Sequence, residues 1–118
     1  MRKFKNILIN ENRSISYLIK KFNKFAYLTN GKGFCVVENN NKKVIGVVTD
    51  GDLRRAIGKK IPLETKISEI TNNKFISVKE NTNFYDILIK FENKIPFIPV
   101  INNKGKLIDI HTYTSFLN

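Results

Sequence analysis

The sequence has few of the residues that build disulfides, metal sites and catalytic centres. Its 118 residues include one cysteine, Cys35, one histidine, His111, and no tryptophan. A lone cysteine forms no internal disulfide, which favours a cytoplasmic setting. No set of Cys, His and Asp has metal-site spacing, and no nucleophile is paired with a base. We therefore predict no catalytic residues, no metal site and no enzymatic activity.

Long apolar runs are also missing. The longest, such as 44–48, are far too short to span a bilayer, and residues 1–6 are not followed by the apolar core of a signal peptide. We therefore expect no membrane association. Hydrophobic residues still make up 42% of the chain, which excludes a disordered protein and is enough for a packed core.

Acidic residues are few: the chain has 10 Asp and Glu and 21 Lys and Arg, which gives a net charge of +11. Such an excess is typical of proteins that bind nucleic acid. However, the lysines are scattered, with only short pairs such as Lys20-Lys21 and Lys59-Lys60. The abundance of Lys, Asn and Ile can also follow from the base composition of the gene. The charge favours anionic ligands, and nucleic-acid binding is the least favoured function.

The chain contains an internal repeat. Residues 8–12 resemble residues 77–81, and the offset, from Glu11 to Glu80, is 80 minus 11, or 69 residues. In both copies, apolar residues then follow at the spacing of an amphipathic helix. They are Ile15, Leu18, Ile19 and Phe22 in the first copy and Phe84, Ile87, Leu88 and Phe91 in the second. Ser14 and Asn83 are candidate N-caps of these helices.

Two short apolar runs joined by a polar turn follow each helix, a pattern typical of a β-hairpin. These runs are 34–40 and 44–49 in the first copy and 97–103 and 107–112 in the second. A closing helix is predicted after each hairpin, and in the second copy it is shortened to residues 114–117. Residues 67–70, in the segment that links the two copies, predict a helical turn. We therefore predict an α+β fold of two intertwined β-α-β-β-α repeats with pseudo-twofold symmetry, residues 1–60 and 61–118. Halves of roughly 50–60 residues bury too little surface to fold alone.

The stretch from Gly46 to Arg55 predicts a buried strand running into a helix. A helix start offers free N–H groups to a phosphate, arginine matches phosphate oxygens, and a carboxylate can accept ribose hydroxyls. Thr49, Asp52, Arg54 and Arg55 are therefore candidates for a nucleotide site. The same sequence also permits a structural interpretation, in which Thr49 and Asp50 cap the helix and the arginines are solvated.

The order of elements, the duplication and the Gly46–Asp52 signature together resemble a pair of CBS domains, the Bateman module, over nearly the whole chain. The resemblance implies a regulatory module that needs no cofactor, forms a homodimer and binds a purine nucleotide between its repeats. AMP, ATP or a guanine nucleotide is the implied ligand. It further implies that Thr49 contacts phosphate and Asp52 holds the ribose. By position, the base would lie near Leu8, Ile9, Phe34 and Cys35.

The second copy departs from this pattern. Thr112 matches Thr49, but Ser115 stands at the position of Asp52 and Asp109 at that of Gly46. Serine cannot hold two ribose hydroxyls with a charged group. We therefore predict one competent nucleotide site and one degenerate site.

The segment 49–55 is similar to CBS segments attached to two kinds of bacterial sugar-pathway enzyme. One is the arabinose-5-phosphate type of sugar-phosphate isomerase, and the other is the nucleotidyltransferase that activates sugars. The segment 107–110 is also similar to the second kind. We expect a regulatory module excised from the N-terminus of a sugar-nucleotide nucleotidyltransferase, with an attached or partner enzyme domain of sugar metabolism. The alternative is a ligand-free dimerisation scaffold.

Overall fold

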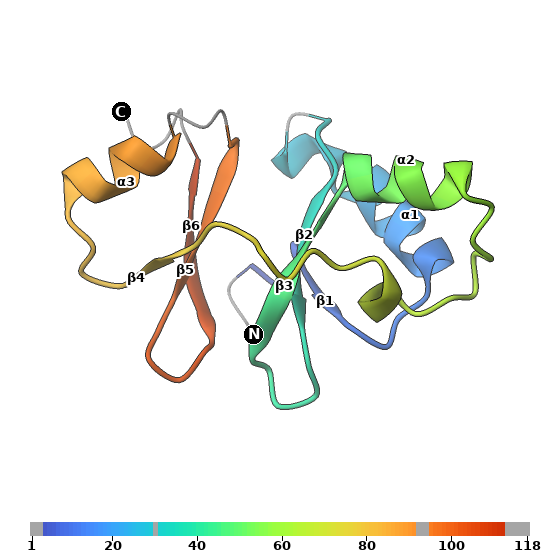
Figure 1. Cartoon of the computed structure of the whole chain (residues 1–118), viewed down its shortest axis with the longest axis horizontal. Coiled ribbons are helices and arrows are strands. Elements are labelled where there is room, and N and C mark those ends of the chain that lie inside the picture. The colour runs from blue at the N-terminus through green and yellow to red at the C-terminus, as the bar shows by residue number, and fades with distance from the viewer. Residues whose placement is uncertain (1–3, 30, 92–94, 113–118) are drawn as a thin grey trace. The chain divides into compact units, whose positions relative to one another are not determined.

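The computed structural model describes residues 4–29, 31–91 and 95–112. The chain divides into two compact units, Met1–Phe75 and Ile76–Asn118, and each contains a three-stranded sheet (Figure 1). Both units begin with the order strand, helix, strand, strand. The predicted α+β class and the predicted repeat of elements are confirmed.

The sheet of the first unit has the strand order β1-β2-β3. β1 (Leu8–Asn10) runs parallel to β2 (Phe34–Glu38), and β2 pairs antiparallel with β3 (Val44–Thr49). All five residues of β2 are buried, as expected for a central strand. In the turn of the predicted hairpin, Asn39 Oδ1 accepts hydrogen bonds from the backbone N–H groups of Asn41 and Lys43.

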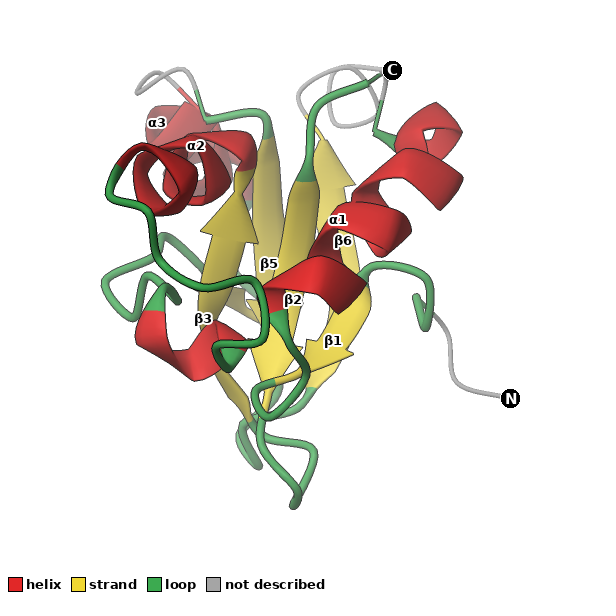
Figure 2. Cartoon of the chain, turned by 90° about the vertical axis from the view of Figure 1, so that its right-hand side faces the viewer, coloured by secondary structure: helices red, strands yellow, loops and turns green. Residues whose placement is uncertain are grey.

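Helices α1 (Ile15–Lys24) and α2 (Asp50–Gly58) lie on the same face of this sheet (Figure 2). The predicted N-cap of α1 is confirmed, because Ser14 Oγ accepts a hydrogen bond from Tyr17 N. A 3₁₀ turn, η1 (Ala26–Leu28), follows α1. The buried core cluster combines residues from the sheet, α1 and the link: Ile9, Leu18, Cys35, Val37, Val48 and Ile67.

The link after α2, residues 59–75, belongs to the first unit and packs against the rest of it. Its predicted helical turn is η2 (Ile67–Glu69), and Ile67 is fully buried. Further along, Asn72 exchanges two backbone hydrogen bonds with Val47 on β3, of 3.0 and 2.9 Å. A Cβ on the neighbouring Gly46 would lie 2.5 Å from the Asn72 carbonyl oxygen. The motif glycine therefore leaves space for the link to cross β3.

The second unit contains β4 (Val78–Lys79), α3 (Phe84–Phe91), β5 (Phe97–Ile101) and β6 (Leu107–Thr112). β4 and β5 are parallel, and β5 and β6 are antiparallel. Asn83 Oδ1 accepts from Asp86 N over 2.9 Å at the start of α3, as predicted for an N-cap. The core cluster consists of Val78, Ile87, Phe91, Ile98 and Val100.

The two hairpins repeat each other in detail. Asn102 Oδ1 binds the N–H groups of Lys104 and Lys106, as Asn39 does in the first hairpin. Gly105 has a φ of 82°, and Lys42 takes the same left-handed conformation at 63°. The predicted closing helix at 114–117 lies outside the described residues. Along the chain, the first compact unit ends at Phe75 and the second begins at Ile76. The predicted boundary between residues 60 and 61 separates the two sequence repeats, and the division into compact units does not test it.

Candidate functional site

The start of α2 is closed by a reciprocal capping box between Thr49 and Asp52. Asp52 Oδ2 accepts from Thr49 N over 2.9 Å and from Thr49 Oγ1 over 3.1 Å, while Thr49 Oγ1 accepts from Asp52 N over 3.5 Å. The Asp52 side chain is only 13% exposed. The structural interpretation of Thr49 as a helix cap is therefore confirmed, and it fixes the position of the Asp52 carboxylate.

The second oxygen of Asp52 binds Arg55. Arg55 Nη2 lies 2.6 Å from Asp52 Oδ1, and the Arg55 side chain is 66% exposed. A Cβ on Gly51 would lie 3.3 Å from Arg55 Nη1, so the glycine leaves room for the guanidinium beside the helix start. The Arg54 side chain is exposed and has no ion pair or hydrogen bond among the described residues.

Asp50 ties the start of α2 to the strand beside it. Its Oδ2 accepts from Gly33 N over 2.7 Å, and its own N–H donates to Gly33 O over 3.1 Å. A Cβ on Gly33 would collide with the Asp50 carboxylate and with the ring of Phe22. Sequence reasoning considered Asp50 only as a capping residue and missed this contact between positions 17 residues apart.

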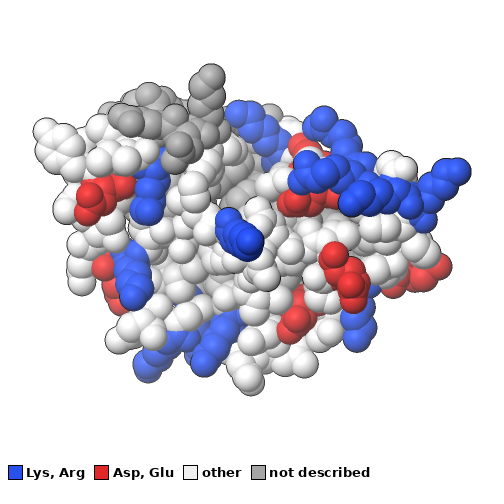
Figure 3. Space-filling view, viewed as in Figure 1, with Lys and Arg blue, Asp and Glu red and all other residues white. Residues whose placement is uncertain are grey.

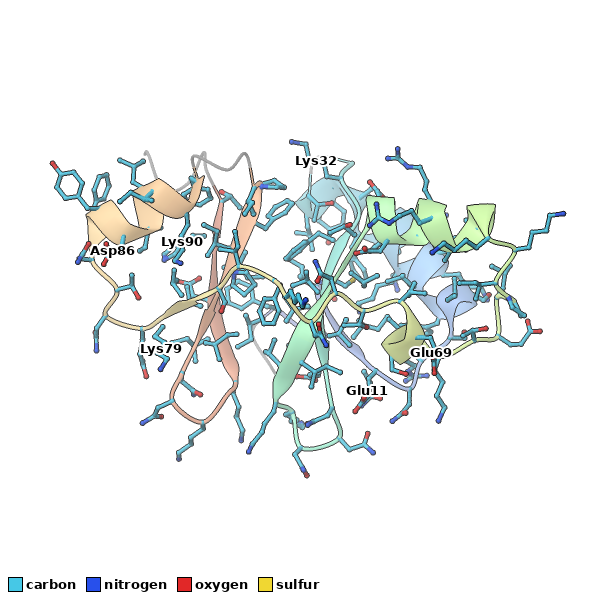
Figure 4. All side chains as sticks on the ribbon, viewed as in Figure 1. Glu11, Lys32, Glu69, Lys79, Asp86 and Lys90 are labelled. Atoms are coloured by element: carbon cyan, nitrogen blue, oxygen red, sulfur yellow. The ribbon has the colours of Figure 1, made fainter. Side chains whose placement is uncertain are left out.

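Asp52 and Arg55 face a cavity of about 190 Å³ within the first unit. The remaining lining residues come from α2 and from the link, where Glu69 is labelled in Figure 4: Ala56, Lys59, Ile61, Glu69 and Ile70. Small-molecule sites are typically about 300–1,000 Å³. The cavity therefore suits part of a nucleotide, such as a sugar ring, rather than the whole molecule. The contribution of the link to this lining was not predicted.

The four residues predicted near the base are buried elsewhere in the first unit. Leu8 is 7% exposed, Ile9 2%, Phe34 7% and Cys35 1%. Ile9 and Cys35 belong to the core cluster, and none of the four lines the Asp52 cavity. Phe34 and Cys35 instead line a separate space of about 10 Å³, which holds at most one water molecule. Burial raises the pKa of the Cys35 thiol to about 12.

Basic side chains gather over α2 (Figure 3). Arg54, Arg55, Lys59 and Lys60 are all exposed on this helix and the residues that end it. Acidic residues in the first turn, Asp50 and Asp52, complement the helix dipole. An anion at the helix start would therefore meet two carboxylates as well as the N–H groups, and the arginines would supply the compensating positive charge.

The corresponding position of the second unit is described only in part. Thr112 ends β6, and the position of Ser115 lies outside the described residues. Asp109, which replaces the motif glycine, binds the backbone N–H of Ile110 through Oδ1 over 2.8 Å. Among the described residues, no group of three or more His, Cys, Asp or Glu is placed to hold a metal ion.

The CBS domain model matches the chain twice, over residues 1–59 and 67–117. The chain belongs to the CBS domain family. It therefore carries two CBS repeats, and its residues Thr49 and Asp52 lie in the first.

Solved CBS structures share this fold. A CBS domain protein from Streptococcus pneumoniae has 18% identity and a TM-score of 0.79, over 94% of this chain and 75% of that one. A CBS domain protein from Pyrobaculum aerophilum, complexed with AMP, has 21% identity and a TM-score of 0.74, over 92% and 80%. The cytosolic domain of the Mg²⁺ channel MgtE, in complex with ATP, has 20% identity and a TM-score of 0.78, over 94% and 43%. No curated protein matches the chain. Among the described residues, no helix has the length and apolar character needed to cross a membrane.

Proposed function

We propose that this CBS pair is a regulatory module that binds an adenine nucleotide at the start of α2, with Asp52 as the ribose-binding residue. The observation that carries the proposal is the Asp52 carboxylate, which is fixed by the capping box and faces a cavity. The Pyrobaculum CBS protein is complexed with AMP and the MgtE domain with ATP, which supports an adenine nucleotide as the ligand.

The residues around Asp52 suggest how each part of the nucleotide binds. A carboxylate oxygen accepts more than one hydrogen bond, so Asp52 can accept from ribose hydroxyls while Oδ2 keeps its bonds to Thr49. The phosphate lies near the first N–H groups of α2, where Arg54 and Arg55 neutralise its charge. Since Ser115 replaces Asp52 in the second repeat, we expect one nucleotide for each chain.

Regulation follows from differential binding. A nucleotide that binds one arrangement of the module more tightly than another favours that arrangement by the difference in binding free energy. The proposed assembly is a homodimer that transmits this change to an attached or partner enzyme domain of sugar metabolism. Similarity of residues 49–55 to CBS segments of sugar-nucleotide nucleotidyltransferases and sugar-phosphate isomerases supports this context. The reading frame around the sequence tests it directly.

Isothermal titration calorimetry with AMP, ATP and GMP tests the binding proposal. We expect one site per chain with a preference for adenine. Asp52→Asn should weaken binding roughly tenfold to a hundredfold, because a hydrogen bond to a charged group contributes about 1.5–3 kcal/mol. Glu64→Gln is the matched control, since Glu64 is exposed and has no contact of this kind among the described residues.

Three results would contradict the proposal. Equal AMP affinity of Asp52→Asn and the parent chain would exclude Asp52 as the ribose residue. No heat with any nucleotide, together with a stable dimer in size-exclusion chromatography, would favour a ligand-free dimerisation scaffold. Binding of labelled oligonucleotides with a steep salt dependence would instead favour a nucleic-acid-binding protein.

A further inference from the structure

A second cavity lies entirely within the unit Ile76–Asn118, between β4 and α3. Its volume is about 390 Å³, inside the range typical of small-molecule sites. The lining combines cationic, anionic, hydroxyl and apolar side chains: Ser77, Lys79, Thr82, Asp86, Ile89 and Lys90. Asp86 and Lys90 lie along α3, and Lys79 lies below them on β4 (Figure 4). None of these residues belongs to the proposed nucleotide site.

The two lysines of this cavity have no ion pair within the part of the chain that the structure describes. Lys79 is exposed and Lys90 half-buried. Among the described residues, neither ammonium group has an ion-pair partner or a hydrogen-bond acceptor. Asp86 lies one helical turn before Lys90, yet no ion pair joins them. Two ammonium groups that line one cavity, neither with a described partner, are suited to a phosphate group.

The other polar groups are suited to hydroxyl groups of a ligand. Asp86 Oδ2 accepts from Asn83 Nδ2 over 3.1 Å, and Oδ1 has no partner among the described residues. Thr82 Oγ1 donates to Lys79 O over 2.6 Å, which leaves its oxygen free to accept. Ile89, an exposed apolar side chain, completes the lining and can contact the carbon skeleton of a ligand.

The first repeat uses the same positions differently. At the offset of 69 residues, Asn10 stands for Lys79, and its amide binds Asn12 N and the Asn40 side chain. Tyr17 stands for Asp86 and lies under the Arg13 guanidinium, 4.5 Å from its carbon to the ring centroid. Lys21 stands for Lys90 and donates to the Lys5 carbonyl over 3.3 Å. All three counterparts are engaged in internal contacts, whereas the Lys79 and Lys90 ammonium groups and Asp86 Oδ1 have no partner among the described residues, so this difference does not follow from the repeat itself.

We propose that the cavity between β4 and α3 binds a small phosphate monoester that also carries hydroxyl groups. Lys79 and Lys90 bind the phosphate, and Asp86 accepts a hydrogen bond from a ligand hydroxyl. The site uses none of the residues at the start of α2, so the proposal gives the chain one anion site in each repeat, built from different elements.

Backbone amide NMR shifts of the full chain, titrated with glycerol 3-phosphate at low ionic strength, test this proposal. We expect shifts that saturate at amides within 77–90. Lys79→Gln and Lys90→Gln should each weaken binding about tenfold, since each removes a charged hydrogen-bond donor. Lys104→Gln is the matched control, because it removes the same charge from the exposed hairpin of the same unit. The spectrum of each variant also reports whether it is folded.

Inorganic phosphate and Asp86→Asn test the role of the carboxylate. The parent chain should bind glycerol 3-phosphate more tightly than inorganic phosphate, and Asp86→Asn should remove that preference. The proposal fails if amides in 77–90 do not shift, or if Lys104→Gln weakens binding as much as the cavity variants. Shifts confined to 49–55 would also overturn it, while leaving the nucleotide site at α2 intact.

Discussion

The Arg55 guanidinium binds the carboxylate on which the proposed nucleotide site depends, with Arg55 Nη2 2.6 Å from Asp52 Oδ1. The other oxygen of Asp52 is held by the backbone and hydroxyl of Thr49. One oxygen of the Asp52 carboxylate is therefore held by the helix cap, and the other is bound by an arginine whose side chain is mostly exposed. A ribose hydroxyl that binds Oδ1 competes with Arg55, and the displaced guanidinium becomes available to the phosphate.

This arrangement predicts opposite effects of Arg55→Ala on two ligands. AMP affinity should fall several-fold to about tenfold, because a charged phosphate partner is lost. Adenosine affinity should stay equal or rise slightly, because no arginine then competes for Asp52. Calorimetric titration with both ligands measures the difference. Arg54→Ala, at the neighbouring exposed arginine, is the comparison: it should also lower AMP affinity, but it should leave adenosine affinity unchanged, because its side chain has no described bond to Asp52. A parallel loss of AMP and adenosine affinity in Arg55→Ala would refute the competition.

Asp52 should also contribute to stability without any ligand. Asp52→Ala removes one half of the capping box, so the free energy of unfolding should fall by about 1 kcal/mol. The ion pair with exposed Arg55 adds little, since surface pairs contribute roughly 0–1 kcal/mol. Urea unfolding of Asp52→Ala, Arg55→Ala and the control Glu64→Ala checks this order. A loss in Arg55→Ala as large as that in Asp52→Ala would show that the ion pair, not the cap, stabilises the helix.

Gly46 should be more important for folding than for ligand binding. In Gly46→Ala the new Cβ meets the Asn72 carbonyl and the Thr71 methyl, both at 2.5 Å, so the link must move away from β3. Overpacking of this kind typically costs about 1–3 kcal/mol. Gly58→Ala, at the end of α2 with no atom within 4 Å, should instead stabilise the chain by about 0.4–1 kcal/mol. Urea midpoints that move in the same direction for both variants would contradict this interpretation of Gly46.

The sequence predicted the elements well because the repeat supports each pattern twice. The apolar spacing after Ser14 also occurs after Asn83, and both residues cap their helices as expected. The hairpin turns were also predicted correctly, because an asparagine begins each one. Local patterns of this kind depend on neighbours within a few residues, which a single sequence displays directly.

The site was predicted only in part, for two physical reasons. A Thr followed three residues later by Asp satisfies a helix cap with the same atoms that a ligand would use, so Thr49 and Asp52 fit both interpretations. Contacts between distant positions leave no local pattern. The bond between Gly33 and Asp50 and the contribution of Glu69 to the Asp52 cavity both depend on how the chain folds back.

The buried thiol of Cys35 should make the first unit less stable at high pH. Burial raises its thiol pKa from 9.0 to about 12, and the nearby charge of Lys21 opposes this only partly. The unfolded chain therefore loses the thiol proton at a lower pH than the folded chain. The contribution of the buried, protonated thiol to the free energy of unfolding is complete below about pH 9 and is lost progressively as the pH rises towards 12.

Comparison with Cys35→Ala isolates this effect, because every other ionisable group is present in both proteins. The variant should be less stable at pH 7, because it leaves a small cavity in the core. The difference in free energy of unfolding should shrink by roughly 1 kcal/mol per pH unit above pH 9. Urea unfolding at intervals between pH 7 and 10.5 measures this difference. A constant difference over the whole range would show that the thiol is not shielded from water in the folded chain.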